Sequence, residues 1–121
     1  MTIENRIVWA EIPAADMDRA MAFYSAVLGT ALTKEDAGPN PIAMLPDARG
    51  KGTSGHVYPG TPAPSGTGPT VHLAVDFPLE EAMARIRDAG GNVVSDVVTI
   101  PAGSFFYATD TEGNSVGLFK V

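Results

Sequence analysis

The sequence predicts an α+β fold made of a duplicated unit, in which one strand is followed by a helix and then by further short strands. Strand-like and helix-like segments follow one another in the same order in both halves of the chain. A stretch rich in proline and glycine, residues 59–69, separates the halves as a linker. The length of 121 residues fits one domain and is too short for two. We therefore expect a single domain over residues 1–121, with a first module at about 5–58 and a second at 70–121.

The first half starts with residues 7–12, whose β-branched and aromatic side chains predict a strand that ends at Pro13. Asp16 is a candidate helix N-cap, and Gly29 is expected to end the helix. Between them, apolar side chains recur at helical spacing: Met17, Ala20, Met21, Tyr24, Val27 and Leu28. Three short strands should follow, separated by turns: residues 32–35, 42–45 and 53–58.

The second half repeats this order. A strand is expected at residues 70–75, and a helix at 79–89 ends before Gly90-Gly91. The remaining strands should be residues 93–100, 105–109 and 115–121. Val8-Trp9 aligns with Val71-His72, 63 residues later. The Ala-Met-Ala of the first helix, residues 20–22, recurs 62 residues later. Agreement in both order and spacing predicts an internal duplication.

Composition excludes several classes of protein. The chain has no cysteine, which rules out disulfides, thiolate metal sites and a cysteine nucleophile. Its net charge of −6 argues against nucleic acid and membrane partners, because phosphate groups and anionic lipids would be repelled. No apolar run is long enough to span a bilayer, and the N-terminus lacks a signal-peptide pattern, so a cytoplasmic location is expected.

Two segments resemble a known family. Residues 16–29 begin with DMDRAMAFY and end with VLG, and they are similar to the first-helix signature of the vicinal oxygen chelate superfamily. This superfamily contains glyoxalases, bleomycin-resistance proteins and extradiol dioxygenases. Residues 110–118, DTEGNSVGL, resemble its D-x-x-G-N-x-h-x-L ending. The closest subgroup is the one described as related to lactoylglutathione lyase. The resemblance implies two βαβββ modules whose mixed sheet curves around a cavity, with the helices outside, and a homodimer.

Metal-using members of this superfamily take one ligand from each of four strands. Carried over, the first-strand ligand falls on Trp9, whose indole offers only an N–H donor, and the last-strand ligand falls on Gly117. Two of the usual ligands are therefore missing. The resemblance implies that the other two ligands come from the strands that contain His56 and His72. Together with Glu11, these could form a displaced divalent-metal set of two histidines and one carboxylate. No other cofactor is expected.

Glu11 and His72 are the candidate catalytic residues. Glu11 is two residues after Trp9, so both side chains should share one face of the strand. Partial burial there would raise the pKa of Glu11 and suit it to general acid or base chemistry. The repeat places His72 opposite Trp9, on the face expected to line the cavity. The alternatives are that His72 is an inert wall residue and that Glu11 is paired with solvent or an arginine at the strand end.

The candidate ligand-binding residues supply aromatic rings, polar groups and space: Trp9, His56, Tyr58, Gly117 and Phe119. By strand alternation, Trp9 and Phe119 could face the cavity, and a glycine at position 117 would leave an apolar pocket that suits a flat organic ligand. The alternative for His56 is an exposed position on an edge strand.

These observations leave three functions open. The first is an enzyme of the isomerase, lyase or cyclase type that does acid–base chemistry on a small metabolite without the standard metal site. The second is a protein that binds and sequesters a small molecule, as bleomycin-resistance proteins do. The third, which the missing ligands disfavour, is a metal-dependent glyoxalase or dioxygenase with displaced ligands.

Overall fold

The computed structural model describes residues 3, 5–36, 40–47 and 54–121. The elements follow in this order: β1 (Trp9–Ala14), α1 (Met17–Leu28), β2 (Thr33–Glu35), β3 (Ile42–Met44), β4 (Ser54–Pro59), β5 (Val71–Ala74), α2 (Leu79–Asp88), β6 (Asn92–Val93), β7 (Val98–Ile100), β8 (Gly103–Thr109) and β9 (Ser115–Lys120). A strand, a helix and further strands thus occur twice, which confirms the predicted α+β class. The first residue of the predicted strand 53–58 lies outside the described residues.

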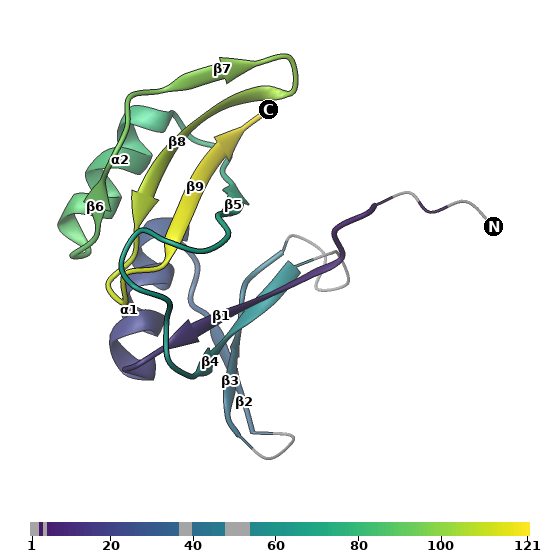
Figure 1. Cartoon of the computed structure of the whole chain (residues 1–121), viewed down its shortest axis with the longest axis vertical. Helices are drawn as coiled ribbons and strands as arrows, with labels where there is room; N and C mark the ends of the chain where they lie inside the picture. Colours follow the sequence, from purple (N-terminus) through teal and green to yellow (C-terminus); the bar gives the residue numbers. More distant parts are fainter. Residues whose placement is uncertain (1–2, 4, 37–39, 48–53) are drawn as a thin grey trace.

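In the described part of the chain the strands form two mixed sheets, one of four and one of five strands, which close no barrel (Figure 1). In the first sheet the order is β1-β4-β3-β2, with β1 and β4 parallel. In the second sheet the order is β5-β9-β8-β6, and β7 also pairs with β8. Here β5 and β9 are the parallel pair. The two sheets therefore repeat the same arrangement, in which the first strand of each module lies beside its last.

The ends of α1 are those that the sequence predicts. The Asp16 side chain accepts a hydrogen bond from the Arg19 N–H at 3.0 Å. Gly29 ends the helix with a left-handed backbone (φ 74°), a conformation that glycine adopts without strain. By contrast, the N-cap residue of α2 is Pro78, which makes no side-chain hydrogen bond to the helix. Neither helix of the described chain is long and apolar enough to cross a membrane.

α1 packs against the first sheet, on β4, and α2 packs against the second sheet, on β6, β8 and β9. Ile12 and Val57 of the first sheet are 2% and 0% exposed, and Phe106 and Leu118 of the second sheet are both 0% exposed. These side chains join those of α1 and α2 in one buried hydrophobic cluster. In Figure 1 the helices lie on one side of the molecule, and the N-terminal arm, residues 5–8, projects from β1 on the other side. The opposite face of each sheet is therefore left without a helix.

Two strands differ from their predictions for identifiable reasons. β1 runs through Pro13 to Ala14 instead of ending at the proline. This is tolerated because β1 is an edge strand, where the missing N–H costs no ladder hydrogen bond. The predicted strand 93–100 is divided into β6 and β7. At the break, the Tyr107 N–H donates to the Ser95 side-chain oxygen at 2.9 Å, so a side chain takes the place of a backbone acceptor.

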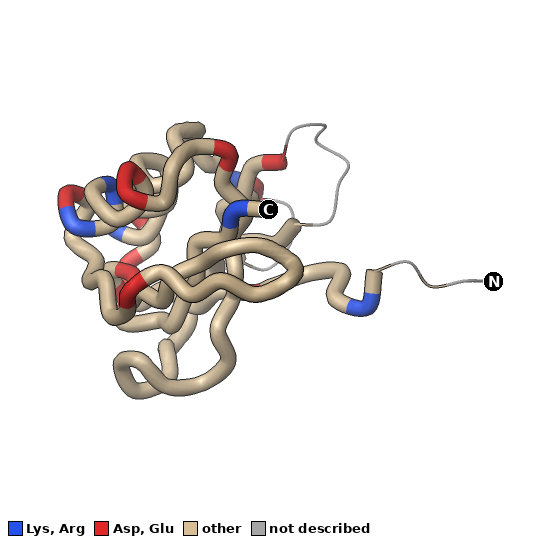
Figure 2. The backbone as a smooth tube through the Cα atoms, turned by 90° about the horizontal axis from the view of Figure 1, so that it is seen from above, with Lys and Arg blue, Asp and Glu red and all other residues tan. Residues whose placement is uncertain are grey.

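Charged residues are concentrated on the helices and turns (Figure 2). Among the strands of the second sheet, all of which are described, Lys120 is the sole charged residue. The second sheet therefore offers an almost uncharged surface wherever the helices do not cover it.

Candidate functional site

The two sheet faces that are turned away from the helices carry the predicted site residues. Side chains alternate along a strand, so residues that are paired in the ladder share a face. Glu11 pairs with His56, and His72 pairs with Gly117. The first open face is formed by the side chains of Trp9, Glu11, Pro13, Ser54, His56 and Tyr58. We call the second open face the side chains of His72, Ala74, Phe105, Tyr107 and Phe119, together with Gly117.

On the first open face, Trp9, His56 and Glu11 form a chain of contacts. The indole N–H of Trp9 donates to His56 Nδ1 at 3.0 Å. His56 Nε2 lies 3.4 Å from Glu11 Oε1. Because Nδ1 accepts the bond from the indole, a neutral His56 carries its proton on Nε2, the nitrogen that lies 3.4 Å from the Glu11 carboxylate. The Tyr58 ring meets the His56 ring edge-on, with 6.1 Å between centroids.

The environments of Glu11 and His56 differ from the predictions. The Glu11 side chain is 67% exposed, so the expected partial burial is absent. The His56 side chain is only 14% exposed, because β4 lies between β1 and β3 rather than at an edge. His56 is therefore a held, mostly covered side chain, and Glu11 is the accessible member of the pair.

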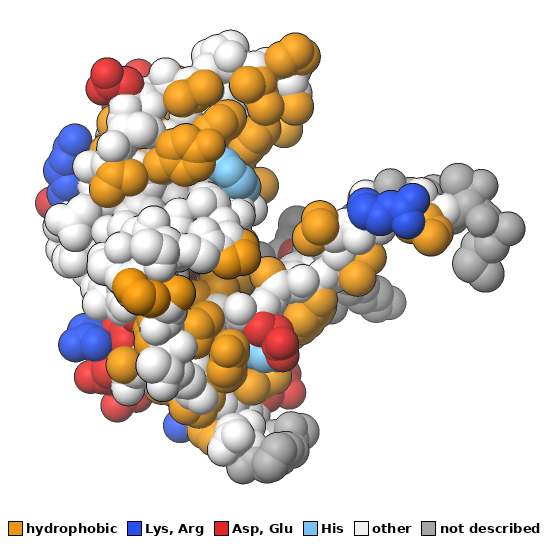
Figure 3. All heavy atoms as spheres, in the orientation of Figure 1, with side chains coloured by type: hydrophobic (Ala, Val, Ile, Leu, Met, Phe, Trp, Pro, Cys, Tyr) orange, Lys and Arg blue, Asp and Glu red, His pale blue; other side chains and the backbone are white. Residues whose placement is uncertain are grey.

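On the second open face, His72 sits among aromatic rings. Its ring meets those of Phe105, Phe119 and Tyr107 at centroid distances of 4.9, 5.7 and 5.9 Å. Phe105 and Phe119 stack on each other at 5.4 Å with an interplanar angle of 11°. Partial desolvation lowers the pKa of His72 below its ordinary value, so its imidazole is mostly neutral at pH 7. Figure 3 shows hydrophobic side chains gathered over the second sheet and histidine side chains at two separate places.

Gly117 makes the position of the His72 ring possible. A Cβ atom at residue 117 would lie 2.1 Å from His72 Nδ1, which is far inside contact distance. The imidazole therefore lies directly over the glycine backbone of the neighbouring strand. At the position where the resemblance places a metal-binding glutamate, this chain has instead a histidine ring stacked on a bare backbone.

The residues present do not fit the four-ligand metal site of the superfamily. Trp9 and Gly117 supply no metal ligand. In the described part of the chain, no three His, Asp or Glu side chains are grouped so that they could hold one metal ion. Glu11 and His56 are close together, but His72 belongs to the other sheet. The displaced set Glu11, His56 and His72 is thus not assembled within this chain, and no contact joins Glu11 to His72 among the described residues.

The two segments that carry the family resemblance bind each other. Tyr24 of α1 donates a hydrogen bond from its hydroxyl to Asp110 Oδ2. Arg19 binds both carboxylate oxygens of Glu112, at 2.7 and 3.0 Å. The Asn114 side chain donates to the Pro13 carbonyl at 2.8 Å. The turn at residues 110–114 therefore holds β1 and α1 of the first module, which gives these signature residues a structural role.

The charge of this contact is firmly fixed. The bond from Arg19 lowers the pKa of Glu112 to about 2, and the backbone N–H of Asp16 adds a further donor at 2.9 Å. Burial, followed by the charge of Asp110, raises the pKa of the Tyr24 hydroxyl well above 10. Tyr24 therefore stays protonated as a donor, and Glu112 stays ionised as an acceptor.

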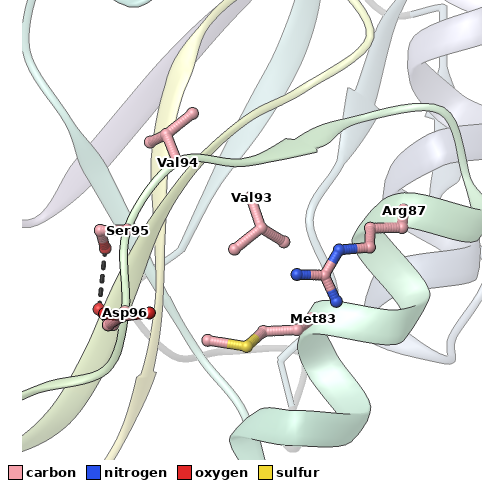
Figure 4. Close-up of a pocket in the computed structure, with 6 residues that line it drawn as sticks. All are labelled: Met83, Arg87, Val93, Val94, Ser95 and Asp96. Atoms are coloured by element: carbon pink, nitrogen blue, oxygen red, sulfur yellow. Dashed lines mark hydrogen bonds between the residues drawn. The ribbon is translucent and has the colours of Figure 1, made fainter.

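Two hollows lie apart from the second open face. One, of about 150 Å³, runs beside the free edge of β1 and includes Glu11 in its lining. The other, of about 360 Å³, lies between α2 and residues 93–96, with Met83 and Arg87 on one wall and Asp96 on the other (Figure 4). The second hollow contains none of the predicted site residues. Neither could be found from the sequence, since each depends on segments brought together only by folding.

Comparison with known proteins decides the family. A family model described as the glyoxalase/bleomycin resistance protein/dioxygenase superfamily matches residues 6–118. The chain belongs to this superfamily. A glyoxylase-like domain-containing protein of Didymella fabae is 29% identical over 125 residues, which cover 95% of this chain and 93% of that protein. The resemblance found in the signature segments is therefore confirmed.

Solved structures of superfamily type share the fold. A glyoxalase/bleomycin resistance protein from Albidiferax ferrireducens T118 matches with a TM-score of 0.73 and 18% identity, covering 97% of this chain and 100% of that one. The fosfomycin resistance protein FosX of Listeria monocytogenes matches with a TM-score of 0.69 and 13% identity, covering 99% and 93%. At such identities the likeness concerns the fold alone. Superfamily members include both enzymes and resistance proteins, and the predicted homodimer stays a prediction.

Proposed function

We propose that this superfamily member binds a flat, uncharged organic molecule on its second open face. The observation that supports this is the neutral His72 ring set among Phe105, Tyr107 and Phe119 on a sheet surface that carries almost no charge. Stacked and edge-on aromatic pairs contribute about 0.5–1.5 kcal/mol each beyond the area they bury. A flat ligand can make several such contacts at once.

His72 supplies the polar anchor that such a site needs. Binding pockets are mostly apolar but contain a few placed polar groups that orient the ligand. Neither ring nitrogen of His72 is hydrogen-bonded to another residue of the described chain. A neutral imidazole has one N–H donor and one acceptor nitrogen, so it can bind a carbonyl or a hydroxyl of the ligand. A phenol or a conjugated ketone would match both the rings and this anchor.

The proposal is tested by titrating the protein with 1-naphthol and following backbone amide resonances by NMR. We expect shifts centred on β5, β8 and β9. Replacing Tyr107, which is 37% exposed, by leucine should weaken binding about five- to tenfold, a loss of one aromatic contact. Tyr58→Leu, on the first open face, is the matched control and should leave the affinity unchanged. Equal effects of the two variants, or shifts centred elsewhere, would contradict the proposal.

A second candidate is an acid–base enzyme that uses Glu11. The chain Trp9–His56–Glu11 favours it, since His56 holds an accessible carboxylate in place and Trp9 holds His56. Glu11 would take a proton from the substrate, and His56 would act as a positioning residue. Incorporation of solvent deuterium into a ketone probe, abolished by Glu11→Gln, would favour this candidate over simple binding. No incorporation above the background rate would remove it.

A further inference from the structure

We propose that the hollow beside β1 is a second binding site, which takes a small protonated amine and uses Glu11 as the counter-charge. We call it the β1 hollow; its lining is formed by Glu11, Ile12, Pro13, Ala63, Thr67, Gly68, Pro69, Val71, Asn114, Ser115 and Val116. It is separate from the second open face, so it goes beyond the function proposed above and does not depend on it.

The walls of the β1 hollow suit a ligand with a small apolar group. They come from β1, from the linker and from the start of β5 and β9, and carbon-rich side chains such as Pro13, Val71 and Val116 contribute to them. The volume is about 150 Å³. A cavity of about this size in another protein accommodates benzene, so the hollow has room for a single six-membered ring or a branched alkyl group.

The free edge of β1 supplies polar backbone groups to this hollow. Successive peptide groups of a strand face opposite edges. The Ala14 carbonyl faces β4, because it accepts from the Gly60 N–H at 3.0 Å, whereas the Pro13 carbonyl accepts from Asn114 on the other edge. Glu11 lies two residues before Pro13 on the strand, so its backbone carbonyl points the same way as that of Pro13. Its carbonyl oxygen therefore faces the edge at which the hollow lies, where it can accept a bond from an ammonium group.

The side chain of Glu11 supplies the charge. It is 67% exposed, and its described ionic partner is His56, at 3.4 Å. No lysine or arginine of the described chain lies within ion-pair distance of it. The carboxylate is therefore accessible, and its contact with His56 restricts its movement, which lowers the entropy cost of binding a cation.

Trp9 strengthens the preference for a cation. It lies two residues before Glu11 on the same strand face and is 44% exposed. Its ring is fixed because its N–H is bonded to His56. An indole face attracts cations by about 0.5–1 kcal/mol at exposed sites. The hollow beside α2 lacks this bias, since both Arg87 and Asp96 line it.

The test compares three probes that share one ring: 2-phenylethylammonium, 2-phenylethanol and phenylacetate. Trp9 is the single tryptophan of the chain and lies two residues before Glu11 on the same strand face, so its fluorescence reports on the surroundings of Glu11. At pH 7.5 we expect the amine to bind at least about tenfold more tightly than the alcohol, with a dissociation constant below about 10 mM, and the acid to bind more weakly than either. Added salt should weaken the amine preferentially. An amine that binds no better than the alcohol, or that gives no saturable change, would overturn the proposal.

Variants and NMR locate the effect. Glu11→Gln keeps the shape of an exposed side chain and should bring the amine-to-alcohol preference close to one. Glu35→Gln, which changes another exposed carboxylate, on β2, is the matched control and should keep the preference. Amine-induced amide shifts should centre on Thr67, Gly68 and Val71. Shifts centred on the second open face, or an unchanged preference in Glu11→Gln, would refute the β1 hollow while leaving the proposed aromatic face standing.

Discussion

Replacing Gly117 by alanine tests how the second open face is built. The new Cβ would lie 2.1 Å from His72 Nδ1, so the imidazole must rotate away from β9. Rotation separates it from three aromatic neighbours, now at 4.9–5.9 Å. At about 0.5 kcal/mol for each contact of a partly exposed ring, the loss is about 1.5 kcal/mol. Restricting the unfolded chain by a glycine-to-alanine change returns about 0.4–1 kcal/mol. The net destabilisation is therefore about 0.5–1 kcal/mol.

Such a small change makes the titration of His72 the sharper measurement. The pKa of His72 is lowered because the ring is buried against its neighbours. Once the alanine moves the ring away from its aromatic neighbours, its partial desolvation is lost and its pKa should rise toward the ordinary value of 6.5. An NMR pH titration of the imidazole Cε1 protons resolves this. The chain has two histidines, so only two such signals have to be assigned.

A double-mutant cycle gives the control. In a His72→Ala background, Gly117→Ala should no longer destabilise the protein, because no ring remains to be displaced. The reasoning is refuted if His72 titrates at the same lowered pH in Gly117→Ala as in the parent protein. It is equally refuted if alanine at residue 117 costs the same stability with and without His72.

Two further predictions concern the turn at residues 110–114. Because Arg19 holds the pKa of Glu112 at about 2 instead of 4.5, this contribution to stability is complete above about pH 4.5 and is lost as the pH falls toward 2. Arg19 is half-exposed, so solvent screening reduces the stabilisation that this ion pair provides. Glu112→Gln should lower the free energy of unfolding in urea by about 1–2 kcal/mol at pH 7 and by much less at pH 3. An equal loss at both pH values would contradict this. Tyr24→Phe should cost about 1–3 kcal/mol because it removes a buried donor to Asp110, and in an alkaline absorbance titration the parent protein should show one more late-ionising tyrosine than the variant.

Local sequence rules located α1 well and the second-half strands less well. Asp16 and Gly29 mark the ends of α1 because capping depends on a few adjacent residues. The division between β6 and β7 could not be predicted, since it depends on Ser95 meeting the Tyr107 N–H across the sheet. The passage of β1 through Pro13 depends equally on β1 being an edge strand, which is a property of the whole sheet.

The same limit applies to the site. Strand alternation correctly predicts that Trp9 and Glu11 share a face, because it needs only the period of the strand. It cannot tell that the Trp9 indole reaches His56, 47 residues away. Nor can it tell that His72 lies on a different sheet from Glu11. To judge the displaced metal set, both the partners of His56 and the sheet that carries His72 had to be known. The loss of a ligand at residue 117, by contrast, could be recognised from the glycine itself.

The turn at residues 110–114 also has a consequence for how the chain folds and how it tolerates cleavage. Its bonds to the first module join residues 86 to 101 positions apart, so they close some of the longest loops in the molecule. Contacts of high sequence separation form slowly. We therefore expect the bonds between this turn and the first module to form only after each half has gained most of its structure. Residues 63–69 of the connection between the halves are exposed, and the Gly66 N–H donates to the Gly113 carbonyl at 3.0 Å. The bonds that join the turn to β1 and α1 are made by residues outside this segment. A protease that nicks this connection should therefore leave two fragments that remain associated as a folded pair.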